Sequence, residues 1–161
     1  NGPSPMGTRF SNRGFFEIGI FHGKSEVNIG TLWRSAYQLG AAGIFTIGRR
    51  YKTQSSDTVK AWRHIPLRHF NMIEELVLAL PNSCPIIAIE MGGTTLSSFK
   101  HPLRACYLLG AEDHGLPDYA LKQCHDVVSL ESARTASFNV AVAGSIVLYD
   151  RMVKLDSTIP F

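Results

Sequence analysis

Apolar residues along this chain gather in short runs that polar and glycine-bearing segments separate. Five of the runs are rich in β-branched and aromatic residues, and several lack the polar alternation of a half-exposed strand. Such runs are typical of strands that are buried on both faces of a parallel sheet. The predicted strands cover residues 15–21, 43–47, 86–90, 105–109 and 126–130.

Helical spacing of apolar residues follows the first predicted strand. Apolar positions recur there at intervals of three and four residues, so we expect a helix with Asn28 as its N-cap and Gly40 just beyond its end. The repeating residues are Ile29, Leu32, Trp33, Ala36 and Tyr37.

The later strands are also separated by segments with helical spacing or helix-start residues. Strands that alternate with helices predict an α/β fold, in which a parallel sheet lies between two helical layers as an α/β/α sandwich. A glycine-bearing exit turn is expected over residues 91–93, directly after the third strand. The helices are expected from Asn71 to Leu80, from Pro117 onward, from Asn139 to about Lys154 and, as a short helix, over residues 56–62.

Composition fits one globular domain. The 161 residues are 45% hydrophobic and 18% charged, which is enough apolar material for a core and excludes a disordered or coiled-coil chain. Residues 1–13 are rich in Gly, Pro, Ser and Asn and lack periodicity, so a flexible tail is predicted ahead of a domain over residues 14–161.

Cysteine usage and hydropathy bear on the compartment. The 3 cysteines are far apart and form no C-x-x-C pair, which favours a reducing compartment and argues against a disulfide framework or a metal site. No apolar run approaches about 18 residues and no leader pattern precedes a cleavage site, so a soluble, unexported, cytoplasmic protein is expected.

Positive charge is concentrated in one segment. Residues 49–70 hold six of the 16 Lys and Arg residues but only one of the 13 acidic residues. Such a concentration is typical of a surface that contacts nucleic-acid phosphates, and a solvated basic loop is the alternative. The candidate RNA-binding residues are Arg49, Arg50, Lys52 and Arg63.

The common nucleotide and hydrolase motifs are absent from the sequence. There is no G-x-x-x-x-G-K-[ST] P-loop, and the turn after the first strand does not carry the G-x-G-x-x-G of a Rossmann fold. There is no G-x-S-x-G elbow, and Ser137 has no obvious histidine to orient it, so a hydrolase triad is not favoured.

Three short polar motifs remain, each beside a predicted strand end or helix start. Taken singly, each also fits an ordinary cap or turn. In this order and spacing, however, they resemble the three motifs of the SpoU/TrmH family of SPOUT-class RNA 2′-O-ribose methyltransferases, over about residues 15–154. The motifs are Asn28, Gly30 and Arg34; Gly110, Glu112 and Gly115; and Ser137 with Asn139.

The resemblance implies a fold, an activity and a set of site residues. The family fold carries a C-terminal deep trefoil knot, an exception to the rule against knots, and its members are homodimers. S-adenosylmethionine is the methyl donor and S-adenosylhomocysteine the product. Arg34 is expected to be the main catalytic residue, assisted by Asn28, Glu112, Ser137 and Asn139. Cofactor contacts, mostly from backbone, are expected at Ile89, Glu90, Met91, Leu109, Gly110, Val128, Leu130 and Phe138.

The substrate that the resemblance implies is tRNA or rRNA. The lack of a separate RNA-recognition domain ahead of the motifs favours tRNA, where compact family members often modify the anticodon wobble ribose. Apolar residues on the first and last helices exceed what one small sheet needs to cover, in keeping with a dimer or, alternatively, a thick core. These residues are Leu32, Trp33, Val142, Ile146 and Tyr149.

The sequence departs from the family pattern in one place. The family usually has Ile-Pro-Met where this chain has Val128, Ser129 and Leu130, and the run to Ser137 is one residue longer. Glu131 and Arg134 are extra charges in that loop. Two other functions stay open on the sequence alone: a catalytically silent RNA-binding module of the same fold, and a nucleotide-binding α/β protein with a small-molecule substrate.

Overall fold

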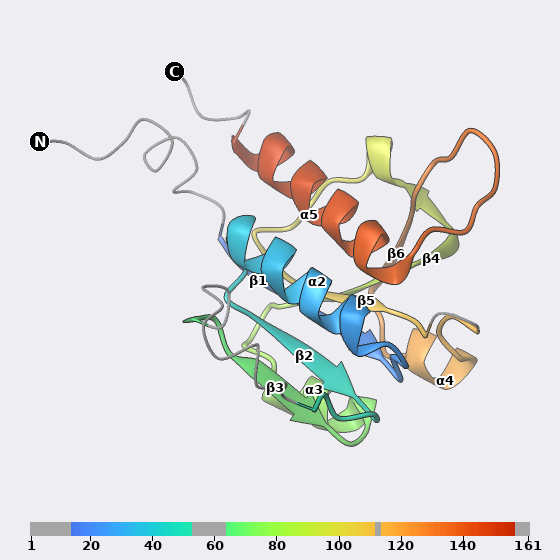
Figure 1. Ribbon diagram of the computed structural model, residues 1–161. Helices are drawn as coiled ribbons and strands as arrows, with labels where there is room; N and C mark the ends of the chain where they lie inside the picture. Colours follow the sequence, from blue (N-terminus) through green and yellow to red (C-terminus); the bar gives the residue numbers. More distant parts are fainter. Residues whose placement is uncertain (1–13, 53–63, 112–113, 157–161) are drawn as a thin grey trace, which may run out of the picture.

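The strands of the protein form a six-stranded sheet in which every neighbouring pair is parallel. The computed structural model describes residues 14–52, 64–111 and 114–156 (Figure 1). The strand order is β3-β2-β1-β5-β4-β6, so the first three strands extend to one edge of the sheet and the last three occupy the other half. The bounds are Phe15–Phe21 (β1), Gly43–Ile47 (β2), Leu67–Phe70 (β3), Ile86–Thr95 (β4), Arg104–Leu109 (β5) and Asp126–Ser129 (β6).

Helices cover both faces of this sheet. Figure 1 shows α2 and α5 side by side across one face, while residues of α3 and α4 contribute to the core on the other. Alternate residues of β5 point to the two cores: Tyr107 and Leu109 to the α2/α5 side, Cys106 and Leu108 to the opposite side. The predicted α/β/α sandwich is therefore confirmed. The helix bounds are Glu26–Gln38 (α2), Ile73–Ala79 (α3), Asp118–Leu121 (α4) and Val140–Asp156 (α5), with a 3-10 turn at Leu96–Ser98 (η3).

Strand β3 was not expected from the sequence. Its residues do not form an apolar run, because it is an edge strand whose polar side chains have partners on β2 and, one strand further, on β1. Arg68 forms an ion pair of 2.5 Å with Glu17, which is buried in β1. The Nδ1 atom of His69 lies 2.9 Å from the hydroxyl of Thr46 in β2.

The first turn of α2 corrects the prediction that Asn28 is the N-cap. Ser25 is the N-cap, with extended backbone angles and a hydroxyl oxygen that accepts a hydrogen bond from the backbone N–H of Asn28 at 3.2 Å. Asn28 is therefore a buried residue inside the first turn. The other end of α2 is as predicted: Gly40 has φ +94°, and Ala41 N–H donates to the carbonyl of Ala36 at 2.9 Å.

Two further boundaries differ from the expected ones. The N-cap of α3 is Met72 rather than Asn71. Residues 91–93 do not leave the sheet as a turn, since β4 continues to Thr95 with a register shift against β6 between Ile89 and Thr94. The glycines of this stretch allow an irregular strand to form where a turn was expected.

The expected helix over residues 56–62 and the predicted tail over residues 1–13 lie outside the described residues. Within the described ranges, no helix is long and apolar enough to cross a membrane. The trefoil knot and the domain limits stay predictions.

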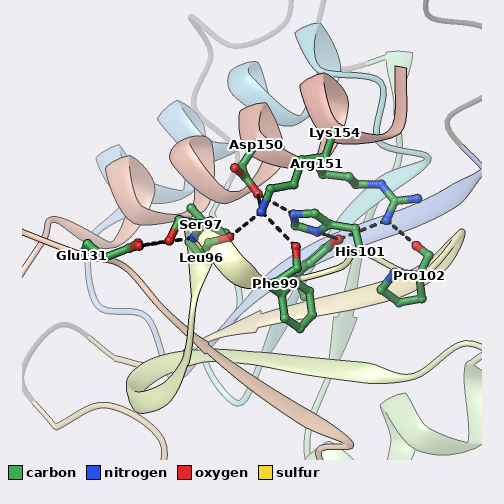
Figure 2. A network of polar contacts seen from close by, with 10 residues as sticks. Leu96, Ser97, Phe99, His101, Pro102, Glu131, Asp150, Arg151 and Lys154 are labelled. Carbon is green, nitrogen blue, oxygen red and sulfur yellow. Dashed lines mark hydrogen bonds and ion pairs between the residues drawn. The ribbon is translucent and has the colours of Figure 1, made fainter. Parts of the chain in front are cut away.

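A buried polar network fixes the segment between η3 and β5 to α5 (Figure 2). The fully buried Arg151 of α5 donates to the backbone carbonyls of Pro102 at 2.7 Å and Leu103 at 2.8 Å. Lys154, one turn further along α5, donates to the carbonyl of Phe99 at 2.9 Å. Arg151 and Lys154 therefore hold this segment through its backbone carbonyls.

His101 lies at the centre of the same network. Its ring nitrogens lie 2.7 Å from the hydroxyl of Tyr107 and 2.8 Å from a carboxylate oxygen of Asp150, and Arg151 donates to that hydroxyl at 3.0 Å. A neutral imidazole, with one donor and one acceptor, completes this series of hydrogen bonds. Burial lowers the pKa of His101, although Asp150 opposes the shift, and burial raises the pKa of Tyr107 to about 12.

Candidate functional site

A cavity of about 350 Å³ lies at the C-terminal ends of β5 and β6 and beside the middle of β4. This is the edge of a parallel sheet where α/β proteins bind their ligands. Seven of the eight predicted cofactor residues line it: Ile89, Glu90, Met91, Leu109, Gly110, Leu130 and Phe138. Val128 does not, because its side chain is fully buried in the core on the α2/α5 side, and its neighbour Ser129 lines the cavity instead.

The turn after β5 forms one wall and depends on two glycines. Gly110 and Gly115 approach so closely that a Cβ atom on Gly110 would lie 2.4 Å from the carbonyl carbon of Gly115. Gly115 has φ +64°, and its N–H donates to the carbonyl of Ala111 at 3.1 Å. Only glycine fits at these two places, which explains the spacing in the second motif. Glu112, the predicted catalytic acid of this turn, lies outside the described residues.

Glu90 braces the same turn from β4. One carboxylate oxygen accepts from the backbone N–H of Leu116 at 2.7 Å, and the other accepts from Met91 N–H at 3.2 Å. The hydroxyl of Ser129 in turn donates to the Glu90 carbonyl at 2.7 Å and accepts from Gly93 N–H at 2.7 Å. These contacts join the exits of β4, β5 and β6 around the cavity. Sequence reasoning missed Ser129, although its place in the family's Ile-Pro-Met position was a visible signal.

Two of the predicted catalytic residues are hydrogen-bonded to each other. The side-chain amide of Asn139 donates to the side-chain oxygen of Asn28 at 3.0 Å, across 111 residues of sequence. The Asn139 oxygen also accepts from the backbone N–H of Val142 at 3.1 Å and so caps the start of α5, which is the alternative role that the sequence left open. The first and third motifs therefore meet where α2 and α5 begin.

The remaining catalytic candidates lie in different places. Ser137 lines the cavity, two residues before Asn139. Arg34 is exposed on α2 and is not part of the cavity lining. One residue further along α2, Ser35 shares a hydrogen bond of 2.8 Å with Ser145 of α5, which adds a second contact between the two helices.

The loop over residues 130–138 covers one side of the cavity and is anchored at its start. Glu131 accepts a hydrogen bond from the hydroxyl of Ser97 in η3, seen on the left of Figure 2. The backbone N–H of Ser97 also points to this carboxylate, at 3.4 Å. These hydrogen bonds lower the pKa of Glu131. The extra charge noted in the sequence thus connects the cavity loop to the segment that α5 holds.

The described part of the basic segment is fastened to α2. Arg49, Arg50 and Lys52 are exposed just beyond β2. The backbone N–H of Lys52 donates to the Glu26 carboxylate at 2.7 Å. Tyr51 is half-buried and packs edge-on against Trp33, with 6.0 Å between the ring centroids. On the far side of the segment, the indole N–H of Trp33 donates to the carbonyl of Ile65 at 3.1 Å. Arg63 lies outside the described residues.

The cysteines are not candidates for nucleophilic chemistry. Cys84 and Cys106 are buried and Cys124 is half-buried, and burial raises the pKa of each thiol. In the described ranges there is no group of three or more His, Cys, Asp and Glu residues that would hold a metal ion.

Sequence comparisons agree with the motifs. A model of the SpoU rRNA Methylase family matches residues 17–149. A tRNA/rRNA methyltransferase of Archaeoglobus fulgidus, described as uncharacterized, is 30% identical over 128 residues, which are 76% of this chain and 57% of that protein. A Mycobacterium avium protein with the same description is 30% identical over 131 residues, 75% of this chain and 41% of its own length. The chain thus spans about half the length of these curated relatives.

Solved structures show the same fold. The SpoU methyltransferase AviRb of Streptomyces viridochromogenes has a TM-score of 0.80 and 24% identity, over 94% of this chain and 64% of its own. A structure that addresses the 2-OH methylation of C/U34 on tRNA has a TM-score of 0.79 and 21% identity, over 90% of this chain and 99% of its own. The AdoMet-bound rRNA methyltransferase of Sinorhizobium meliloti has a TM-score of 0.76 and 23% identity, over 88% of this chain and 57% of its own. Because the family model matches residues 17–149 and the fold is shared, this chain belongs to the SpoU rRNA Methylase family.

Proposed function

We propose that this protein transfers a methyl group from S-adenosylmethionine to a ribose 2′-oxygen of RNA. The observation that carries the proposal is the Asn28–Asn139 hydrogen bond, which brings the first and third motifs together beside a cavity walled by the second. The family match and the tRNA/rRNA methyltransferase relatives support the same reaction class.

The cavity residues fit S-adenosylmethionine. Ile89, Leu109 and Leu130 offer apolar surface, and the strand exits offer backbone groups where glycines admit close approach. A volume of about 350 Å³ is within the range of small-ligand sites. The Sinorhizobium and AviRb proteins have been solved with AdoMet bound. When bound, this cofactor supplies an electrophilic methyl group on a sulfonium.

Arg34 is proposed to stabilise the oxyanion that develops on the ribose. A guanidinium does not readily lose its proton, so it suits electrostatic stabilisation better than general-base catalysis. A phosphate of the RNA or a water molecule then accepts the 2′-hydroxyl proton. Glu112 is proposed to orient Arg34, and Ser137 to position groups at the cavity mouth beside Asn139.

The exposed cations after β2 are proposed to contact RNA phosphates. Arg49, Arg50 and Lys52 lie at the C-terminal side of the sheet, and the contacts of Tyr51, Lys52 and Ile65 hold both described ends of the basic segment against α2. RNA affinity should therefore fall steeply with salt. Arg63 is proposed to join this surface.

Between the two RNA classes we favour tRNA. The proposal follows the structure that addresses the 2-OH methylation of C/U34 on tRNA, which has the same fold at a TM-score of 0.79. A reducing, cytoplasmic setting is proposed from the cysteine usage.

A homodimer is proposed to form through the outer face of α5. Val142, Ile146, Tyr149 and Val153 lie at helical spacing and are 46%, 37%, 58% and 44% exposed. Leu32 and Trp33, which were also expected to contribute, do not, because both are buried in the core of the single chain.

Radiolabelled methyl transfer tests the function. The protein is incubated with methyl-labelled S-adenosylmethionine and separately with bulk tRNA and bulk rRNA, and the RNA is digested to nucleosides. We expect label in 2′-O-methylated nucleosides from tRNA. Label in a base would contradict ribose specificity, and label only in rRNA would reverse the substrate preference. RNA binding without any transfer would support the catalytically silent module.

A further inference from the structure

Glu90 lines the cavity, and its carboxylate lies against Gly115, which lines the cavity too. Glu90 stands where β4 passes the exits of β5 and β6, and of the described residues that line the cavity it is the only Asp, Glu, Lys or Arg. The rest of the described lining is apolar, small or neutral apart from His114. Among these described residues, no other Asp, Glu, Lys or Arg offsets the electrostatic field of Glu90 inside the cavity.

The carboxylate is held in a fixed place. Its two oxygens accept from Leu116 N–H at 2.7 Å and Met91 N–H at 3.2 Å. Gly115 packs against it so closely that a Cβ atom there would lie 2.4 Å from the Glu90 oxygen. Glu90 is thus preorganised at the wall rather than free to turn into solvent.

Within the part of the chain that the structure describes, no ion pair offsets the charge of the Glu90 carboxylate. Both of its side-chain hydrogen bonds come from neutral backbone amides, and none of the ion pairs among the described residues involves it. The wall therefore presents a fixed negative charge to whatever the cavity holds.

We propose that the charge of Glu90 makes the cavity bind S-adenosylmethionine, the methyl donor, more tightly than S-adenosylhomocysteine, the by-product of methyl transfer. This inference rests on the proposed cofactor. S-adenosylmethionine and S-adenosylhomocysteine share their adenosine and amino-acid parts and differ by one methyl group and one positive charge on sulfur. A fixed carboxylate attracts the sulfonium and gains nothing from the neutral thioether. At an effective dielectric of about 20 this preference is on the order of tenfold at a separation of about 12 Å, and it is larger at shorter separations.

The preference matters because both compounds compete for one cavity. Transfer of the methyl group removes the positive charge, so the attraction to Glu90 ends when the by-product forms. Glu90 is thereby a specificity-determining residue that favours exchange of spent cofactor for fresh donor. Its second contribution, the brace on the turn at Gly115 and Leu116, acts equally on both compounds.

Binding calorimetry on the full chain separates these two contributions. Glu90→Gln removes the charge but keeps an oxygen that accepts from Leu116 N–H. The ligands are S-adenosylmethionine, S-adenosylhomocysteine and sinefungin, in which a protonated amine replaces the sulfonium. Glu74→Gln is the matched control, because it makes the same chemical change on α3, on the other face of the sheet.

We expect Glu90→Gln to weaken both charged ligands about tenfold and the neutral thioether by less than twofold. Glu74→Gln should leave all three affinities unchanged. In the unaltered protein, added salt should reduce the ratio between the affinities for S-adenosylmethionine and S-adenosylhomocysteine. In Glu90→Gln, salt should have little effect on this ratio. Glu90→Ala, which also removes the brace, should weaken all three ligands.

Equal weakening of the three ligands by Glu90→Gln would overturn charge selection and leave only the brace. No change in any affinity would overturn it as well. An unaltered protein that binds none of the three would instead refute S-adenosylmethionine as the cofactor, and this inference with it. The two failures are therefore distinguishable.

Discussion

The Asn139 side chain makes two different hydrogen bonds, and single substitutions can remove one without the other. Its side-chain oxygen caps α5 through Val142, while its side-chain N–H₂ donates to Asn28. Asn139→Asp keeps the capping oxygen but replaces the donor by a second acceptor. We expect this variant to retain most of its thermal stability and to lose methyl transfer. Asn139→Ala, which removes the cap too, should lose about 1 kcal/mol of stability. Thermal melts and label incorporation measure the two effects, and full activity in Asn139→Asp would show that methyl transfer does not need the Asn139 donor.

Arg34 supports a second prediction at the level of a single side chain. Because only the guanidinium fork matches an oxyanion beside a phosphate, Arg34→Lys should lose transfer almost as fully as Arg34→Ala. Since Arg34 is exposed and outside the cavity lining, both variants should bind S-adenosylmethionine like the unaltered protein. Single-turnover rates and calorimetry provide the measurements. Substantial turnover in Arg34→Ala would show that another group stabilises the oxyanion.

Residue-level predictions from the sequence succeeded where backbone geometry dictates the residue type. Gly40, Gly110 and Gly115 each occupy a place that only glycine fits well. The N-cap of α2 was misplaced because Ser25 and Asn28 are both good capping residues, and the apolar repeat begins only at Ile29. What decides between them is the burial of Asn28 against Asn139, a contact between distant segments that a local pattern does not contain.

The loop over residues 130–138 gives a prediction for one structural element. If the contact from Glu131 to Ser97 holds the loop, Ser97→Ala should expose the neighbouring Arg134 to trypsin more often. Cleavage after Arg134 should accelerate about two- to fivefold, the range expected for an exposed charged contact. Mass spectrometry of the C-terminal fragments measures this without any cofactor.

Four further variants test this contact specifically. Ser97→Thr keeps a hydroxyl and should restore slow cleavage, whereas Ser98→Ala changes an equivalent exposed serine of the same turn and should have no effect. The double variant with Glu131→Ala should be cleaved no faster than Glu131→Ala alone, because one contact is removed only once. Additive effects would mean that the two residues act separately.

At the level of elements, apolar runs and helical repeats predicted the buried parts of the sheet and the helices that cover it. Five of the six strands were expected, because the four central strands are apolar on both faces and the edge strand β6 still carries Val127 and Val128 toward the two cores. Strand β3 was missed since an edge strand is stabilised by pairs such as Arg68–Glu17, which are visible only once the strands are aligned. The contact that anchors the cavity loop was not predicted either, because Glu131 and Ser97 are far apart in sequence.

The network around His101 predicts how the stability of the whole molecule depends on pH. Because burial lowers the pKa of His101 in the folded protein, the unfolded chain binds the proton more readily. Its contribution is therefore complete above the unfolded pKa of about 6.5 and is lost as the pH falls below that value. His101→Gln should lose about 1–3 kcal/mol near neutral pH.

The difference in melting temperature between the unaltered protein and His101→Gln should shrink between pH 7 and pH 5. Asp150, Arg151 and Lys154 surround His101 and are unchanged in the variant, so their own titration largely cancels in the comparison. A difference that stays constant over this range would mean that His101 does not take up its proton on unfolding.

Pairing of two copies is the prediction at the largest scale. The outer face of α5 exposes Val142, Ile146, Tyr149 and Val153, and a continuous apolar helix face of this kind marks an interaction surface. A second copy would place the same face against it by two-fold symmetry. Ile146→Glu with Tyr149→Glu introduces two unpaired charges at its centre, which an apolar interface does not tolerate.

Light scattering on the purified protein measures the outcome. The unaltered protein should have twice the chain mass of 17.8 kDa, and the double variant should fall to one chain mass with unchanged secondary structure by circular dichroism. Leu78→Glu is the control, because Leu78 is 87% exposed on α3 and accepts the same change away from α5.

If each active site needs the partner copy, the double variant should lose RNA methylation together with dimerisation, while Leu78→Glu keeps both. A monomeric unaltered protein with full activity would show that one chain holds the complete site.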